Sequence, residues 1–111
     1  MIKYPRVRKI KIVIFMKAKI HQIDLRTILA VCDKEHIGKT YEEGEICFKA
    51  SERFYNGEEI TEKQLLEMIK ECDSGNFFGN KCVDILLKND LVSEKSILII
   101  KGVKHVQIYH M

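Results

Sequence analysis

The chain has 111 residues and a mass of 13.0 kDa, which is enough polypeptide for one domain. Hydrophobic residues make up 46% of it and charged residues 32%, so it can build both a core and a solvated surface, which excludes a disordered chain. The net charge is only +3, and no apolar run approaches the roughly 18 residues of a membrane span, so we expect no membrane partner.

Positive charge is concentrated at the start of the chain. Residues 1–23 carry seven Lys or Arg residues and no acid, and this +7 within a total of +3 leaves −4 for the remainder. We interpret residues 1–15 as a basic extension of a domain over residues 16–111, able to bind phosphates. Two other interpretations stay open: an exposed strand face, or a true start at Met16. The candidate phosphate contacts are Arg6, Arg8, Lys9 and Lys11.

The first half of the domain is predicted to be mainly strands. Alternation predicts a strand over Lys17–Gln22, and a β-branched apolar run predicts a buried strand over Thr27–Cys32. Asp33–Gly44 is polar and contains two glycines, which indicates a long loop. Glu45–Ala50 alternates again and predicts a strand, and Ser51–Glu59 is expected to be a loop.

Two helices are predicted next. Thr61 and Gln64 have the spacing of a capping box, so a helix should begin there and run to about Cys72. Gly75 suits a left-handed helix stop. A second helix is expected over Phe77–Lys88.

The chain is predicted to end in strands. Ile97–Ile100 is apolar, Lys101-Gly102 indicates a turn, and Lys104–Tyr109 alternates. Together these elements predict a single α/β domain of the α+β type. Its mostly antiparallel or mixed sheet, containing Thr27–Cys32, Ile46–Ala50 and Ile97–Tyr109, should pack against the helix pair.

The cysteines indicate the cellular compartment. They are isolated from one another, and zinc knuckles need close pairs, so we expect no metal and no cofactor. The apolar run at residues 12–16 is too short for a secretory signal. We therefore expect free, buried thiols in a reducing cytoplasm. The four are Cys32, Cys47, Cys72 and Cys82.

Few residues suggest chemistry. Asp33 follows a buried strand and is either a general base or a cap that accepts backbone amides of the following loop, of which we favour the cap. On the last strand, His105, Gln107 and Tyr109 share one face because side chains alternate. Asn76 precedes the second predicted helix and is a candidate N-cap. No triad or carboxylate pair suggests catalysis.

Four stretches occur together in the order LAVCDKEHIGKTYEEGE, SERFYNGEE, GNFFGNKCVDILLKNDLV and IIKGVKHVQ. On these motifs the chain resembles, over residues 16–111, the small archaeal domain-of-unknown-function family 424. Two positions depart from the family pattern: Lys104 stands where the family tends to have Pro, and Gly75 where it tends to have Ala. The family has no agreed activity, and its small size and archaeal restriction suggest an accessory protein associated with translation.

Two functions follow as expectations. The first is a non-enzymatic cytoplasmic binding protein that engages RNA or a ribonucleoprotein. The alternative is a small enzyme or ligand-binding protein whose polar cleft gathers Asp33, Lys39, Asn76, His105 and Gln107. No residue is assigned a catalytic role. The candidate binding residues are Asp33, Gly38, Lys39, Tyr55, Asn76, Gly79, His105 and Gln107.

Overall fold

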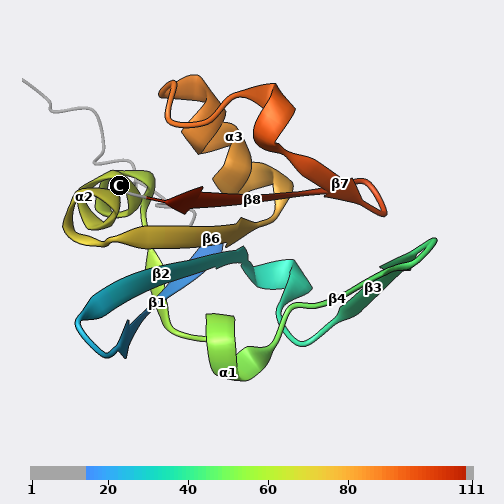
Figure 1. The fold of residues 1–111 in the computed structure, drawn as a ribbon, viewed down its shortest axis with the longest axis horizontal. Coiled ribbons are helices and arrows are strands. Elements are labelled where there is room, and N and C mark those ends of the chain that lie inside the picture. Colours follow the sequence, from blue (N-terminus) through green and yellow to red (C-terminus); the bar gives the residue numbers. More distant parts are fainter. Residues whose placement is uncertain (1–14, 110–111) are drawn as a thin grey trace, which may run out of the picture.

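A six-stranded mixed sheet organises the protein (Figure 1). The computed structural model describes residues 15–109. The sheet contains β1 (Met16–Ile23), β2 (Arg26–Asp33), β5 (Glu58–Ile60), β6 (Ser74–Phe78), β7 (Leu98–Ile100) and β8 (Val103–Tyr109). The strand order is β5-β1-β2-β6-β8-β7, and β2 and β6 are the one parallel pair among these strands.

The remaining elements cover this sheet. They are the hairpin strands β3 (Thr40–Glu43) and β4 (Ile46–Lys49), and the helices α1 (Glu52–Tyr55), α2 (Glu62–Glu71) and α3 (Asn80–Lys88). Short 3₁₀ turns lie at Lys34–His36 and Glu94–Ser96. No helix within residues 15–109 is long and apolar enough to cross a membrane. The predicted α+β domain with a mixed sheet is confirmed.

Alternation along β2 divides the core into two layers. Leu29 and Val31 face one side, where they pack with the apolar faces of α2 and α3. Ala30 and Cys32 face the other side, where α1 and the β3–β4 hairpin supply aromatic rings. Helices α2 and α3 therefore cover one face of the sheet, and α1 and the hairpin cover part of the opposite face.

The predicted capping box is present at the start of α2. The Thr61 hydroxyl accepts the Gln64 backbone N–H at 3.2 Å, and the Gln64 side chain accepts the Thr61 N–H at 2.9 Å. Ile60 and Leu65, on either side of this cap, are both buried in the helix-covered core layer. The local pattern was therefore sufficient to locate this helix.

The predictions of a helix stop at Gly75, an N-cap at Asn76 and a helix start at Phe77 were wrong for the segment Ser74–Phe78. These residues form β6, a central strand between β2 and β8, and α3 begins at Asn80. Asn76 is consequently a strand residue rather than an N-cap, and Gly75 lies opposite Leu29 instead of ending a helix. The physical reason is tertiary: the strand is stabilised by pairing with two segments distant in the sequence.

Three smaller predictions also need correction. The expected long loop after β2 contains β3, which pairs with β4, so Ile46–Ala50 is not part of the main sheet. The expected loop over Ser51–Glu59 contains α1 and most of β5. Cys47 is exposed, because it lies on the hairpin outside both core layers, whereas the other three cysteines are buried.

Candidate functional site

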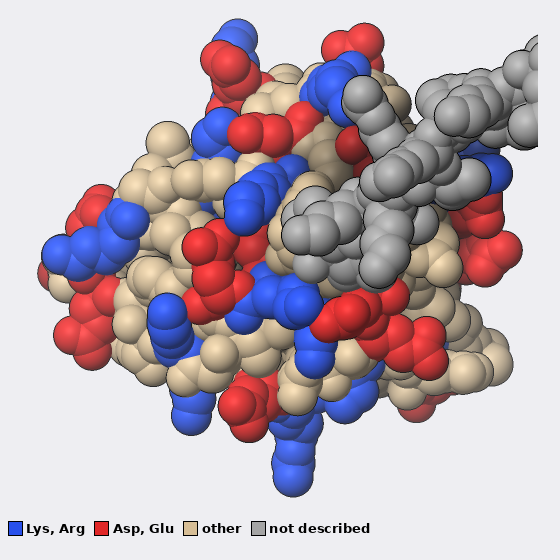
Figure 2. Space-filling view, turned by 180° about the vertical axis from the view of Figure 1, so that it is seen from behind, with Lys and Arg blue, Asp and Glu red and all other residues tan. Residues whose placement is uncertain are grey.

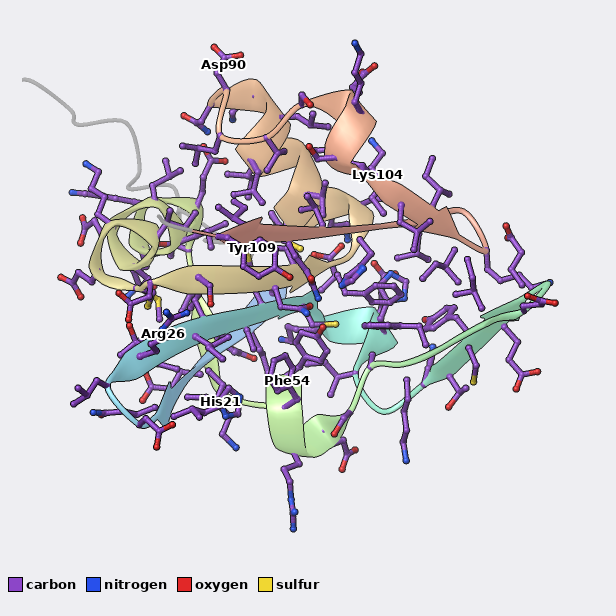
Figure 3. All side chains as sticks on the ribbon, viewed as in Figure 1. His21, Arg26, Phe54, Asp90, Lys104 and Tyr109 are labelled. Carbon is purple, nitrogen blue, oxygen red and sulfur yellow. The ribbon has the colours of Figure 1, made fainter. Side chains whose placement is uncertain are left out.

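The hairpin and α1 leave part of their sheet face open, and a groove of about 190 Å³ lies there. We call it the sheet groove; it is lined by Ile28, Phe54, Ser74, Gly75, Asn76, Gln107 and Tyr109. Strands β2, β6 and β8 form its floor. In Figure 3, Tyr109 from β8 lies above β6 and Phe54 from α1 lies below β2, so the two residues stand at opposite edges of the groove.

Side chains of β1 hold α1 at the edge of the groove. Lys19 Nζ donates to the Arg53 carbonyl at 2.8 Å, and His21 Nε2 lies 2.8 Å from the Phe54 carbonyl. The His21 ring also stacks on the Phe54 ring, with centroids 4.6 Å apart and planes 9° from parallel. Gly57 permits this close docking, since a Cβ there would lie 2.0 Å from the Ala18 carbonyl oxygen. Phe54 is therefore fixed in place.

A chain of hydrogen bonds crosses the end of the groove. The buried Tyr55 hydroxyl donates to Asn76 Oδ1, and His105 Nε2 lies 3.1 Å from the same oxygen. The His105 ring packs against Phe48 at 4.9 Å between centroids. Burial lowers the pKa of His105 and raises that of Tyr55, so the imidazole is kept neutral and the phenol protonated. Both groups are thus in a state that can donate to Asn76.

Asp33 lies on the other, helix-covered side and caps α3. Its carboxylate accepts the backbone N–H groups of Lys81 at 2.9 Å and Cys82 at 3.0 Å. Gly79, at the N-cap position, has φ +131°, and a Cβ there would lie 2.3 Å from Asp33 Cγ. Burial raises the pKa of Asp33, while the two backbone hydrogen bonds oppose that rise. Asp33 thus joins β2 to α3. It accepts backbone amides as expected of a cap, but they belong to a distant helix, and its side chain makes no cap hydrogen bond to the turn that follows it.

Asp33, Glu35 and His36 bring one potential ligand atom each to within 4.8 Å of one another. Both Asp33 oxygens already accept helix amides, and the N-terminal end of a helix is unfavourable for a cation. Lys81 Nζ lies 3.8 Å from Glu35, which supplies a competing positive charge. His36 Nδ1 is 2.5 Å from the Tyr41 hydroxyl. We therefore assign no metal to this cluster.

The structure brings some of the predicted site residues together. Tyr55, Asn76 and His105 form one hydrogen-bonded chain, and Gln107 lies beside Asn76 in the strand register. Of these four, Asn76 and Gln107 line the groove, and the other four predicted positions lie elsewhere. Asp33 and Gly79 meet at α3, Gly38 packs against Glu52, and Lys39 is exposed beside the hairpin. Arg6, Arg8, Lys9 and Lys11 lie outside the described residues.

Sequence reasoning missed the aromatic walls of the groove. Tyr109 was placed on the same face as His105 and Gln107 but was not named as a site residue. Phe54 carried a weak signal, because a serine three residues before it can be a helix N-cap. In the structure the Ser51 side chain accepts the Phe54 N–H at 3.4 Å and caps the short helix that carries this ring. Arg26 and Arg53, which adjoin groove-lining segments in the chain, gave no signal, because the groove itself depends on the tertiary fold.

The fold and the groove define a small α+β protein with an open, aromatic-walled sheet face. The chain belongs to the family described as Protein of unknown function (DUF424), which matches residues 20–111. It is similar in structure to an uncharacterized conserved protein from Methanopyrus kandleri, with a TM-score of 0.72 and 25% sequence identity. That match covers 86% of this chain and 91% of the other. No curated protein matches the chain.

Proposed function

We propose that this protein is a non-enzymatic RNA-binding protein that holds a single-stranded segment in the sheet groove. The observation that carries the proposal is that two aromatic residues, Phe54 and Tyr109, line the same groove as the amides of Asn76 and Gln107. Single-stranded RNA is recognised in this way, by stacking bases on aromatic rings and hydrogen-bonding their edges. Tyr109 is 67% exposed and so is available to a ligand.

Charge around the groove supports an anionic partner. Arg26 lies two residues before Ile28 on the same face of β2, and Arg53 directly precedes Phe54. Both are exposed, and within residues 15–109 neither forms a salt bridge. Figure 2 shows the molecule from behind the view of Figure 1, and there the described basic and acidic side chains are interspersed. Exposed basic residues this near to groove-lining residues in the chain would attract phosphates.

The lining of the groove supports binding rather than catalysis. No Asp, Glu, Cys or His is among the residues that line it, so the groove surface offers no general base and no thiol nucleophile. The imidazole of His105 is engaged with Asn76 behind that surface. The volume of the sheet groove, about 190 Å³, is below the roughly 300 Å³ of drug-sized ligand sites. A groove of this size suits a flat group that lies partly in solvent.

The proposal extends to the cellular setting. Four free cysteines, three of them buried, are chemically stable in a reducing compartment, so we place the protein in the cytoplasm. The basic residues 1–15 would add phosphate contacts to those of the groove. An accessory role with a ribonucleoprotein of translation is consistent with both features.

The test is RNA binding by the full chain, measured by fluorescence anisotropy with a labelled single-stranded octamer of mixed sequence. We expect the double variant Arg26→Glu, Arg53→Glu to weaken binding at least about tenfold and to reduce the salt slope by about 1.4, the value for two phosphates on a single strand. The control is Lys63→Glu, Lys70→Glu, which makes the same charge change on exposed positions of α2. Equal losses in the two double variants, or no binding by the unmodified protein, would contradict the proposal.

A further inference from the structure

The side-chain amide of Asn76 is held in one orientation. Its Oδ1 accepts a hydrogen bond from the Tyr55 hydroxyl and lies 3.1 Å from His105 Nε2. A neutral imidazole with its proton on Nε2 donates this bond, so the oxygen is occupied by two donors. The amide nitrogen must then point the other way. Within residues 15–109, no hydrogen bond is made by Asn76 Nδ2.

The side-chain amide of Gln107, on the neighbouring strand β8, is also oriented by a tyrosine hydroxyl. The Tyr109 hydroxyl donates to Gln107 Oε1 at 2.5 Å, which leaves the amino group of Gln107 without a partner among the described residues. Asn76 and Gln107 are directly opposite each other in the β6–β8 register. No buried side-chain nitrogen or oxygen in the described part of the chain lacks a hydrogen bond, so both amino groups are at the surface. Two tyrosines thus orient two neighbouring amides as donors.

We infer that the sheet groove selects a nucleobase that carries a ring carbonyl and discriminates against adenine. This inference rests on the proposed RNA binding and specifies which bases the groove takes. Two neighbouring N–H donors need acceptors on the ligand. Guanine offers O6 and N7, whereas adenine places an amino donor beside N7. Uracil and cytosine also carry carbonyl oxygens, and adenine is the one standard RNA base with none.

The rings and amides have separate roles in this recognition. Stacking on Phe54 and Tyr109 tolerates every base, since every base has a π-face. The amides must therefore distinguish one base from another. An amide N–H that faces the amino group of adenine meets a second donor, and neither group then has a hydrogen-bond acceptor. Tyr55 and Tyr109 act as positioning residues, since each fixes an amide through its hydroxyl.

The experiment compares labelled octamers of inosine and adenosine at one salt concentration. Their bases differ at position 6, where inosine has a carbonyl and adenosine an amino group, and at the adjacent N1, which carries a hydrogen only in inosine. We expect inosine to bind about tenfold more tightly. Gln107→Met should reduce this ratio toward one, while the control Gln22→Met, an exposed amide outside the groove, should not. Tyr109→Phe keeps the ring but frees the Gln107 amide to turn, so the ratio should fall while inosine affinity stays within about twofold.

The outcomes separate this inference from the proposal beneath it. Equal binding of the two octamers, with the dependence on Arg26 and Arg53 retained, would overturn base selection and leave RNA binding intact. A preference for inosine that survives both Gln107→Met and Tyr109→Phe would also overturn it. Failure of the protein to bind either octamer would overturn the RNA-binding function itself.

Discussion

His105 shows how one side chain joins stability to the site. Its ring contacts Phe48 and its Nε2 faces Asn76, so protonation would place a charge in a partly buried aromatic setting. Burial lowers the pKa of His105 below its usual value of about 6.5, and the unfolded chain therefore binds this proton more tightly than the folded one. The stability that the neutral ring contributes is present above about pH 6.5 and is lost as the pH falls through the lower folded pKa.

We therefore predict that acidification destabilises the protein through His105. The measurement is the free energy of urea unfolding of the unmodified protein and of His105→Gln, whose side chain can still donate to Asn76 but does not titrate. The difference between the two should change between about pH 7.5 and about pH 5, to the disadvantage of the unmodified protein. Asp33, whose pKa is raised by burial, acts with the opposite sign but cancels in this difference. A difference that is constant with pH would contradict the prediction.

At the scale of elements, the junction of β2 with α3 is a tight one. Gly79 is in the left-handed region with φ +131°, and the added Cβ of an alanine would collide with the Asp33 side chain. We predict that Gly79→Ala lowers the free energy of unfolding by at least about 2 kcal/mol, because strain and lost capping add together. The control is Gly44→Ala, with φ +60° and no atom within 4 Å of the new Cβ, which should cost about 1 kcal/mol. Similar losses in urea unfolding of both variants would refute the close contact.

The elements also show where sequence reasoning succeeds. The start of α2 was predictable because both partners of its capping box lie within four residues. Alternation likewise placed His105, Gln107 and Tyr109 on one face of β8. By contrast, β6 is short, and the apolar pair after Asn76 is equally typical of a helix start. Its identity as a strand depends on pairing with β2 and β8, which no local pattern contains. The contact of Asn76 with His105 was unpredictable for the same reason.

For the whole molecule, charge is divided between the body and the start of the chain. Five basic residues and no acid lie in residues 1–14, whereas all sixteen acidic residues lie within the described part. Basic residues that act through phosphates contribute to affinity without regard to base identity. The basic extension and the sheet groove should therefore make separable contributions, one to affinity and one to selectivity.

We predict that charge reversal at the four basic positions proposed to contact phosphates strongly weakens RNA binding. The salt slope should fall by about 2.8, as expected for four phosphate contacts on a single strand. The preference for inosine over adenosine should be unchanged, since the groove is untouched. These positions are Arg6, Arg8, Lys9 and Lys11. Salt titrations by anisotropy measure both quantities, and unchanged affinity after deletion of residues 1–15 would contradict the prediction.

The cap on α3 also has a consequence for how the chain folds. Asp33 lies 48 and 49 residues before the two amides that it accepts, and the hairpin, α1, β5 and α2 all fall between them. A nine-residue helix is marginal in isolation, so α3 gains its stability late, once β2 is in place. Closing so long a loop costs chain entropy before the contact between Asp33 and α3 can stabilise the fold. Folding should therefore be slower than in proteins built from local contacts. Helix α3 and the parallel β2–β6 pair should therefore form in one cooperative step that completes the sheet.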